Sequence, residues 1–142
     1  MTIAELERYM KSRARVKERE EKDYYATPTD EVLNILNTLK FDFTGKTILE
    51  PCIGGGHMAL GINKYIEDNG QFYVRRIGTD VQNRGFEDSY WETGYGFDFL
   101  SDDYPHDKAD IIIMNPPYSI LEPFLIRAIE IAQEKLIVLC RM

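Results

Sequence analysis

Residues 115–118 combine residue types that can hold an amino group. Asn115, Pro116, Pro117 and Tyr118 come directly after the apolar stretch Asp110–Met114. Two prolines fix the backbone and remove two N–H donors. The turn therefore presents carbonyl oxygens, an amide side chain and an aromatic ring. These groups suit a planar molecule whose amino group donates to the oxygens while Tyr118 stacks on its face. The competing interpretation is a surface turn without chemistry.

A glycine turn is the second candidate. Gly54, Gly55 and Gly56 follow Pro51, which ends the predicted strand Lys46–Glu50. Such a turn lets the backbone approach a ligand closely and exposes N–H groups at the start of the next helix. The spacing of Gly54 and Gly56, with an alanine three residues later, fits the dinucleotide fingerprint G-x-G-x-x-A. The same pattern also suits a tight turn that only packs a helix on a strand.

Two carboxylates favour the ligand interpretation. Glu50 stands at the end of a strand predicted to be buried, where a carboxylate needs a partner. Asp80 ends the next predicted strand, 24 residues after Gly56. At that position an acidic residue would accept hydrogen bonds from ribose hydroxyls.

Predicted strands and helices alternate along the chain. Apolar residues at i, i+3, i+4 and i+7 from Val32 to Leu39 predict a helix that begins at Thr29. A near-continuous apolar run, as in residues 110–114, is typical of a strand buried on both faces. Alternation of this kind gives a parallel sheet with its site at the carboxyl ends of the strands. Three further helices are predicted: one after Gly56, a short one within Gln82–Gly96, and one that begins with a capping box at Ser119–Glu122. Ile129 is among the core-facing residues predicted for the last of these helices. The remaining predicted strands are Phe72–Asp80, Tyr95–Phe97 and Lys135–Cys140.

Composition predicts a single cytoplasmic domain. The chain has 142 residues, of which 44% are hydrophobic and 29% charged. No apolar run approaches the roughly 18 residues of a membrane helix, and the charged N-terminus lacks a signal-peptide core. Cys52 and Cys140 are too few for a disulfide framework or a Cys-based zinc site. We therefore expect a reducing compartment, no metal and no contact with a membrane.

Charge divides the chain into two expected parts. Residues 1–22 hold seven Lys/Arg against five Asp/Glu, whereas residues 23–142 hold ten against nineteen. We expect a charged helix over 1–23 and one domain over 24–142, whose acidic surface does not by itself attract a phosphate backbone. The helix suits either phosphate contacts or a solvated surface with i,i+4 ion pairs. Its aligned basic residues are Arg8, Lys11, Arg15, Arg19 and Lys22.

With both motifs in place, the sequence resembles a known family. It is similar to the class I S-adenosylmethionine-dependent amino-methyltransferases, and most of all to the N6-adenine DNA methyltransferases. The resemblance spans residues 24–140 in the family's motif order. It implies an α/β, Rossmann-like sheet with helices on both faces, S-adenosylmethionine as the cofactor and adenine in DNA as the substrate.

The resemblance also implies roles for individual residues. Asn115–Tyr118 resembles the family's catalytic tetrapeptide, and Tyr25–Pro28 its N-terminal motif near the methionine end of the cofactor. Glu50–Gly56 resembles the glycine loop, Asp80 the ribose ligand, and Asp98–Phe99 the pair beside the cofactor's adenine. The candidate cofactor-binding residues are Tyr25, Thr27, Pro28, Glu50, Pro51, Cys52, Gly54, Gly56, Asp80, Val81, Asp98 and Phe99.

The family's chemistry agrees with these residue types. The lone pair of adenine N6 is delocalised into the ring, so the amine is a poor nucleophile. Hydrogen bonds from its protons to the Asn115 side-chain oxygen and the Pro116 carbonyl would localise the lone pair. The base must leave the duplex, which makes Tyr118 a stacking platform. The rate would come from positioning and electrostatics rather than from proton transfer.

Two features of the family are missing from this sequence. The family's fold continues past the fifth strand with a helix and two more strands, and a target-recognition region follows the catalytic part. This chain ends at Met142, so we expect Lys135–Cys140 to be an apolar sheet edge that needs a covering partner or self-associates. We expect the partial core of a restriction-modification or phage-type enzyme, assisted by a separate recognition region or subunit.

Other functions fit parts of the same pattern. Protein-glutamine and RNA N-methyltransferases also use N-P-P-Y; the acidic body favours a protein substrate, whereas Tyr25–Pro28 favours DNA adenine. A nicotinamide-dependent oxidoreductase would explain the glycine turn but would leave Asn115–Tyr118 without a role. A non-catalytic, cofactor-binding remnant predicts binding without turnover.

Overall fold

The structure is a computed structural model that describes residues 27–140. The predicted N-terminal helix over residues 1–23, its aligned basic residues and Tyr25 lie outside the described residues. Between residues 27 and 140, no helix is long and apolar enough to cross a membrane.

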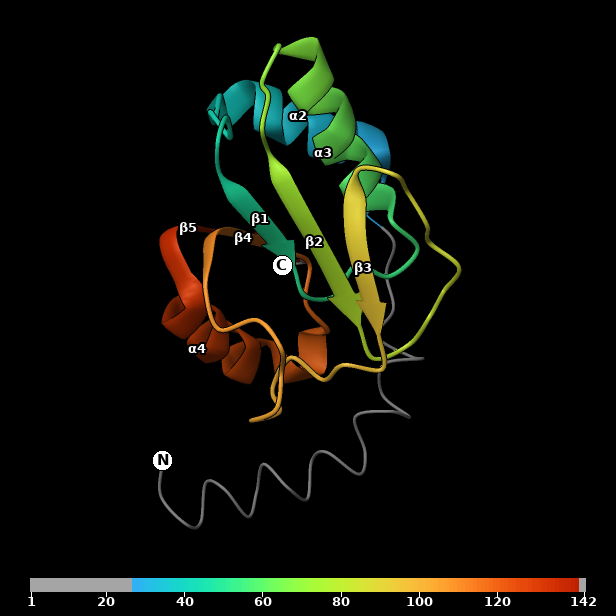
Figure 1. Cartoon of the computed structure of the whole chain (residues 1–142), viewed down its shortest axis with the longest axis vertical. Coiled ribbons are helices and arrows are strands. Elements are labelled where there is room, and N and C mark those ends of the chain that lie inside the picture. Colours follow the sequence, from blue (N-terminus) through green and yellow to red (C-terminus); the bar gives the residue numbers. More distant parts are fainter. Residues whose placement is uncertain (1–26, 141–142) are drawn as a thin grey trace.

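One parallel sheet forms the centre of the fold (Figure 1). Its strands are β1 (Thr47–Glu50), β2 (Arg75–Asp80), β3 (Trp91–Tyr95), β4 (Ala109–Met114) and β5 (Ala132–Val138). They lie in the order β3-β2-β1-β4-β5, and every pair of neighbours is parallel. The chain moves outward from β1 to β2 and β3, then returns to the other side of β1. In open α/β sheets, ligands bind where the strand order reverses, which here is between β1 and β4.

Helices cover both faces of this sheet. They are α2 (Thr29–Leu39), α3 (His57–Asp68), α4 (Leu121–Ile131) and the short 3-10 helix η1 (Tyr118–Ile120). The buried residues of α2 and α3 share one hydrophobic cluster, and those of α4 belong to the other. Strand β4 serves both clusters, because Ile111 and Ile113 point to the first while Ile112 and Met114 point to the second. The predicted Rossmann-like α/β sheet with helices on both faces is confirmed.

The two helices that flank the first strand were predicted well. In α2, Val32 and Leu36 are buried, as their spacing indicates, whereas Leu39, predicted on the same face, is 53% exposed. In α3 the buried residues include Ala59, Ile62 and Tyr65. The helical spacing of apolar residues predicts these helices correctly because both helices bury their apolar faces against the same side of the sheet.

The prediction for the segment between β2 and β3 was wrong. Residues 82–90 contain no helix, and β3 begins at Trp91 rather than near residue 95. Side-chain turns replace the helix: Asn83 Oδ1 accepts a hydrogen bond from Gly85 N, and Asp88 Oδ1 accepts one from Tyr90 N. Asn and Asp compete with helical hydrogen bonding in this way.

The last helix and strand also differ from the prediction. The N-cap residue of α4 is Ile120 rather than the predicted Ser119, and Ile120 makes no side-chain capping hydrogen bond; the short helix η1 precedes α4. Ile129, expected to face the core, is 67% exposed. Strand β5 lies at an edge of the described sheet, as predicted, but it spans Ala132–Val138 rather than Lys135–Cys140. It is only partly buried, and residues 133–135 are exposed.

Candidate functional site

The glycine turn joins β1 to α3 at the carboxyl end of the sheet. Gly54 and Gly56 adopt left-handed backbone conformations, with φ of 56° and 85°. At Gly56 an added Cβ atom would lie 1.9 Å from the Phe86 ring. Glycine is therefore required here by both backbone conformation and space.

Asp80, at the end of the neighbouring strand β2, is hydrogen-bonded to this turn. Its Oδ2 accepts a hydrogen bond from Gly54 N at 2.8 Å, and its Oδ1 accepts one from Gln82 N at 3.3 Å. Ile53 N donates to the Thr79 carbonyl, also at the end of β2. The N–H groups of Ile53 and Gly54 are therefore bonded to the end of β2, and ligand contacts by the N–H groups at the start of α3 stay a prediction. A carboxylate has about four acceptor positions, so Asp80 keeps further acceptor capacity.

Glu50 is a carboxyl group in the interior of the protein. It ends β1, is 1% exposed and accepts a hydrogen bond from Cys52 N at 3.0 Å. Burial raises the pKa of Glu50 to about 8, and the nearby charge of Asp80 adds to the increase. A carboxyl group kept protonated in this way is poised to ionise when a positive charge arrives beside it.

The N-P-P-Y turn is connected to the other predicted motifs. Asn115 Nδ2 donates a hydrogen bond to Thr27 Oγ1 at 2.6 Å, across 88 positions of sequence. The Cys52 thiol lies 3.4 Å from the Asn115 carbonyl oxygen and donates to it; burial raises the pKa of this thiol, so it stays protonated. Thr27, Glu50, Cys52 and Asn115 therefore form one connected group at the switch point of the sheet.

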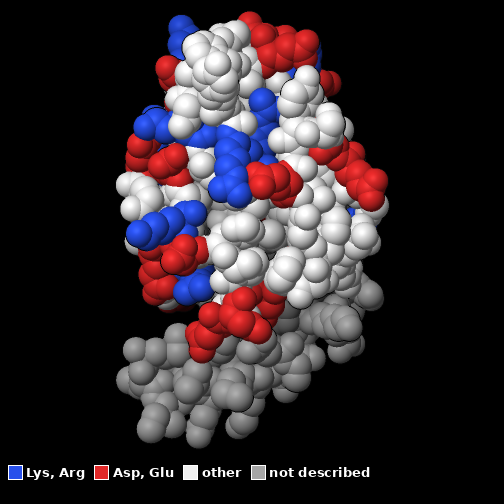
Figure 2. All heavy atoms as spheres, viewed as in Figure 1, with Lys and Arg blue, Asp and Glu red and all other residues white. Residues whose placement is uncertain are grey.

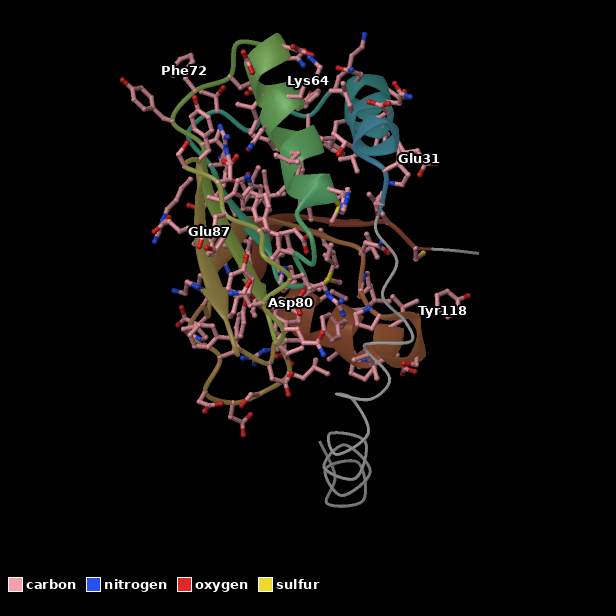
Figure 3. The ribbon with its side chains drawn as sticks, turned by 90° about the vertical axis from the view of Figure 1, so that its right-hand side faces the viewer. Glu31, Lys64, Phe72, Asp80, Glu87 and Tyr118 are labelled. Atoms are coloured by element: carbon pink, nitrogen blue, oxygen red, sulfur yellow. The ribbon has the colours of Figure 1, made fainter. Side chains whose placement is uncertain are left out.

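Tyr118 stands at the outer end of this turn. Pro116 is buried and Pro117 is half-buried, whereas Tyr118 is 59% exposed on η1. Figure 3 shows Tyr118 pointing outward at the side of the molecule, at about the height of Asp80 and far from Phe72 near the top. The turn therefore runs from a fixed, buried start to an accessible aromatic ring.

The remaining candidates make other contacts. Asp98 forms a turn in which its Oδ1 accepts a hydrogen bond from Leu100 N at 2.9 Å. Phe99 is 1% exposed and packs in the core, with ring centroids 5.2 Å from Tyr104 and 5.1 Å from Phe124. Val81 is half-buried beside Asp80, and Pro28 is the N-cap residue of α2. A role in cofactor binding stays a prediction for all of these residues.

Sequence reasoning missed a layer of supporting residues. The Thr79 and Tyr104 hydroxyls form a 2.6 Å hydrogen bond beneath the glycine turn, and Thr79 also donates to the Pro51 carbonyl. Phe86 packs over Gly56. No spacing signal marks these residues, because each comes from a different element and they meet only in the folded chain.

Comparison with solved structures identifies the fold class. The chain matches a proposed RNA methyltransferase from Pyrococcus horikoshii with a TM-score of 0.58 and 24% identity, over 82% of this chain and 63% of that one. It also matches a proposed hemolysin from Lactococcus lactis with a TM-score of 0.54 and 18% identity, over 72% of this chain and 52% of that one. A proposed hemolysin from Streptococcus thermophilus matches with a TM-score of 0.52 and 13% identity, over 72% of this chain and 39% of that one. The chain spans between 39% and 63% of the length of these proteins. No model of a protein family and no curated protein matches the sequence. The chain therefore has an α/β fold of the methyltransferase type.

Proposed function

We propose that this chain is the cofactor-binding and catalytic core of an S-adenosylmethionine-dependent methyltransferase that acts on the N6 amine of adenine in DNA. One observation carries the proposal: the N-P-P-Y turn follows β4 at the switch point and is hydrogen-bonded to Thr27 and Cys52. A surface turn without function needs no such connections to two distant segments.

The residues at this end of the sheet fit the proposed cofactor. Glu50 is a buried carboxyl group that has no cationic partner among residues 27–140, and the amino group of S-adenosylmethionine would supply one. Asp80 has acceptor capacity for the ribose hydroxyls. When bound, the cofactor supplies an electrophilic methyl group on a positively charged sulfur.

The chain's own contribution would be to prepare the attacking nitrogen. Asn115 accepts a hydrogen bond from one proton of the target amine, and the Pro116 carbonyl accepts one from the other. Both bonds strengthen as the nitrogen lone pair becomes localised, so they stabilise the transition state more than the bound substrate. Tyr118 stacks on the extruded base and holds its plane in place.

Charge bears on the choice of substrate. Over residues 23–142 the chain holds ten Lys/Arg against nineteen Asp/Glu, and on the face in Figure 2 the two signs are interspersed. Such a surface gives little attraction to a phosphate backbone. We therefore propose that a separate recognition region or subunit provides the phosphate contacts. The same acidic surface is the observation that favours the second candidate, a glutamine side chain in a protein.

A methylation assay with tritiated cofactor tests the proposal. The chain is offered adenine-containing duplex DNA, tRNA, rRNA or a peptide-chain release factor, and single-turnover label transfer is measured. We expect transfer to DNA, reduced about 100-fold by Asn115→Ala, the scale for the loss of one preorganised polar contact. Transfer only to RNA or only to release factor would mean that the substrate is that molecule and not adenine in DNA. Cofactor binding without methyl transfer to any acceptor would mean that the chain is a cofactor-binding protein without catalytic activity.

A further inference from the structure

The contact between Asn115 and Thr27 has a direction. Asn115 Nδ2 donates and Thr27 Oγ1 accepts, at 2.6 Å. The two ends of an amide side chain have opposite roles, because the nitrogen donates two hydrogen bonds and the oxygen only accepts. Thr27 therefore holds the nitrogen end and turns the oxygen end of the Asn115 side chain away from itself.

Thr27 is itself held firmly. It is 9% exposed and stands immediately before the N-cap residue of α2. Two residues later, Thr29 Oγ1 donates a 3.0 Å hydrogen bond to the His57 carbonyl at the start of α3. The two helices touch closely, since a Cβ atom added at Gly61 would lie 2.9 Å from Val32 Cβ. The start of α2 is therefore a fixed point from which a hydroxyl can orient a neighbour.

We propose that Thr27 is a positioning residue for the proposed methyl transfer, and that its hydroxyl holds the Asn115 amide so that the amide oxygen faces the target amine. This inference rests on the proposed function. It gives Thr27 a role on the substrate side of the site, whereas the family resemblance implies a contact with the cofactor.

Chemistry explains why the orientation matters. If the amide rotated by 180°, Asn115 would present N–H groups to an amine whose two protons must themselves be accepted. Donor would face donor, and the lone pair would stay delocalised. An amide that donates from its nitrogen also accepts more strongly at its oxygen, because hydrogen bonds in a chain polarise one another. Thr27 therefore adds to both the direction and the strength of the Asn115 contact.

Two substitutions at Thr27 separate positioning from cofactor binding. Thr27→Val keeps the shape and removes the hydroxyl, and Thr27→Ser keeps the hydroxyl. We expect Thr27→Val to lower the single-turnover rate about tenfold, with the cofactor Kd changed by less than twofold, and Thr27→Ser to restore most of the rate. Thr38→Val is the matched control, since it removes a hydroxyl of α2 that donates to the Asn34 carbonyl within that helix, and it should leave the rate within twofold of the parent. A large loss of cofactor affinity in Thr27→Val would overturn the proposal.

A double-mutant cycle tests whether Thr27 acts through Asn115. In an Asn115→Ala background, Thr27→Val should cause no further loss of rate, because the group that it positions is gone. A further tenfold loss in that background would mean that Thr27 acts on something else, and the proposal would fail.

A spectroscopic measurement is independent of activity. In ¹⁵N-labelled protein, the Asn115 side-chain amide signal is identified by its loss in Asn115→Ala. We expect this signal to shift, and its hydrogens to exchange faster with solvent, in Thr27→Val but not in Thr27→Ser or Thr38→Val. An unchanged signal in Thr27→Val would refute the contact whether or not the chain methylates any substrate. If the signal shifts and no acceptor is methylated, the proposed function alone fails.

Discussion

The Glu50 carboxyl retains a proton at pH values where most carboxyl groups are ionised. Burial raises its pKa from 4.5 to about 8. Between these values the unfolded chain has released the proton and the folded chain still binds it. Stability must therefore fall as pH rises through the window, with a slope of up to about 1.4 kcal/mol per pH unit from this group.

Glu50→Gln tests this linkage. The amide keeps an acceptor for Cys52 N but cannot ionise, so the free energy of unfolding of the variant should decline less between pH 5 and pH 8 than that of the parent. Urea denaturation at pH 5, 6.5 and 8 measures the difference. Glu92→Gln is the control: the pKa of Glu92 is lowered by its hydrogen bond with Arg75, so any stability it contributes is lost only on acidification below its usual range. A parent-like pH slope in Glu50→Gln would show that Glu50 is ionised in the folded chain.

Asp80 is expected to govern cofactor affinity. We predict that Asp80→Ala weakens S-adenosylmethionine binding by roughly 1.5–3 kcal/mol, the scale of a hydrogen bond to a charged group. Calorimetric titration measures the affinity, and circular dichroism checks the fold, because Asp80 also accepts the Gly54 hydrogen bond. Asp42→Ala removes a carboxylate that accepts a turn hydrogen bond from Thr44 N far from this end of the sheet, and its affinity should equal the parent's. Equal affinities for Asp80→Ala and the parent would refute the assignment.

Tyr118 is expected to capture the target base with its ring. Tyr118→Ala should weaken substrate binding by roughly 1–3 kcal/mol, the scale for one stacking platform, while Tyr118→Phe should be nearly neutral. Phe72 offers a matched control, because it is also 59% exposed and lies far from Tyr118 (Figure 3). Titration of each variant with adenine-containing DNA measures the effect. An equal loss of DNA affinity in Phe72→Ala and Tyr118→Ala would mean that Tyr118 has no specific role in binding the target base.

At the scale of elements, the junction between β1 and α3 depends on a glycine with no free space for a side chain. Gly56 has φ of 85° and contacts the Phe86 ring, whereas Gly85 has φ of 87° and open space around its Cβ position. Gly85→Ala should cost about 1–2 kcal/mol of stability, the price of a left-handed alanine. Gly56→Ala should cost that amount plus about 1–3 kcal/mol of overpacking. Urea denaturation compares the two, and equal losses would show that Phe86 moves away freely.

Elements with strong internal patterns could be predicted from the sequence, and elements shaped by tertiary contacts could not. The spacing of Val32 and Leu36 was sufficient to predict α2, and the apolar run at Ile111–Ile113 was sufficient to predict β4. In both elements these apolar residues are buried in the folded chain. Trp91 begins β3 because it packs in the first hydrophobic cluster, which no local pattern reveals. Ile129 repeats at helical spacing yet faces solvent, because in the described residues nothing covers that side of α4.

At the scale of the whole molecule, topology assembles a site from segments that are far apart in sequence. The positions of Glu50, Asp80 and Asn115 could be predicted, because each follows a strand and parallel strands end at one edge of the sheet. The hydrogen bond between Thr27 and Asn115 could not, because it depends on how α2 packs against α3 after the chain has folded. Sequence therefore indicated which residues gather, and the structure shows which of them touch.

The second edge of the sheet leads to a prediction about assembly. Strand β5 pairs only with β4 among the described strands, and its last residues, 136–138, are half-buried. Part of this edge is already protected, since Lys46 pairs with Glu134 at 2.5 Å and the Lys135 ammonium lies over the Phe41 ring. The remaining backbone groups of an edge strand invite pairing with another chain, and a charge placed there opposes it.

We therefore propose that the chain self-associates at tens of micromolar through the Lys135–Cys140 edge, as measured by sedimentation velocity in reducing buffer. Cys140 is exposed, so it can be changed without loss of core packing. Cys140→Ser removes the thiol and should associate like the parent, which separates edge pairing from disulfide formation. Cys140→Lys adds a charge at the same position and should shift the chain toward monomer. A parent chain that stays monomeric over this range would rule out the edge as a self-association surface, and equal association of the Ser and Lys variants would place the contact elsewhere.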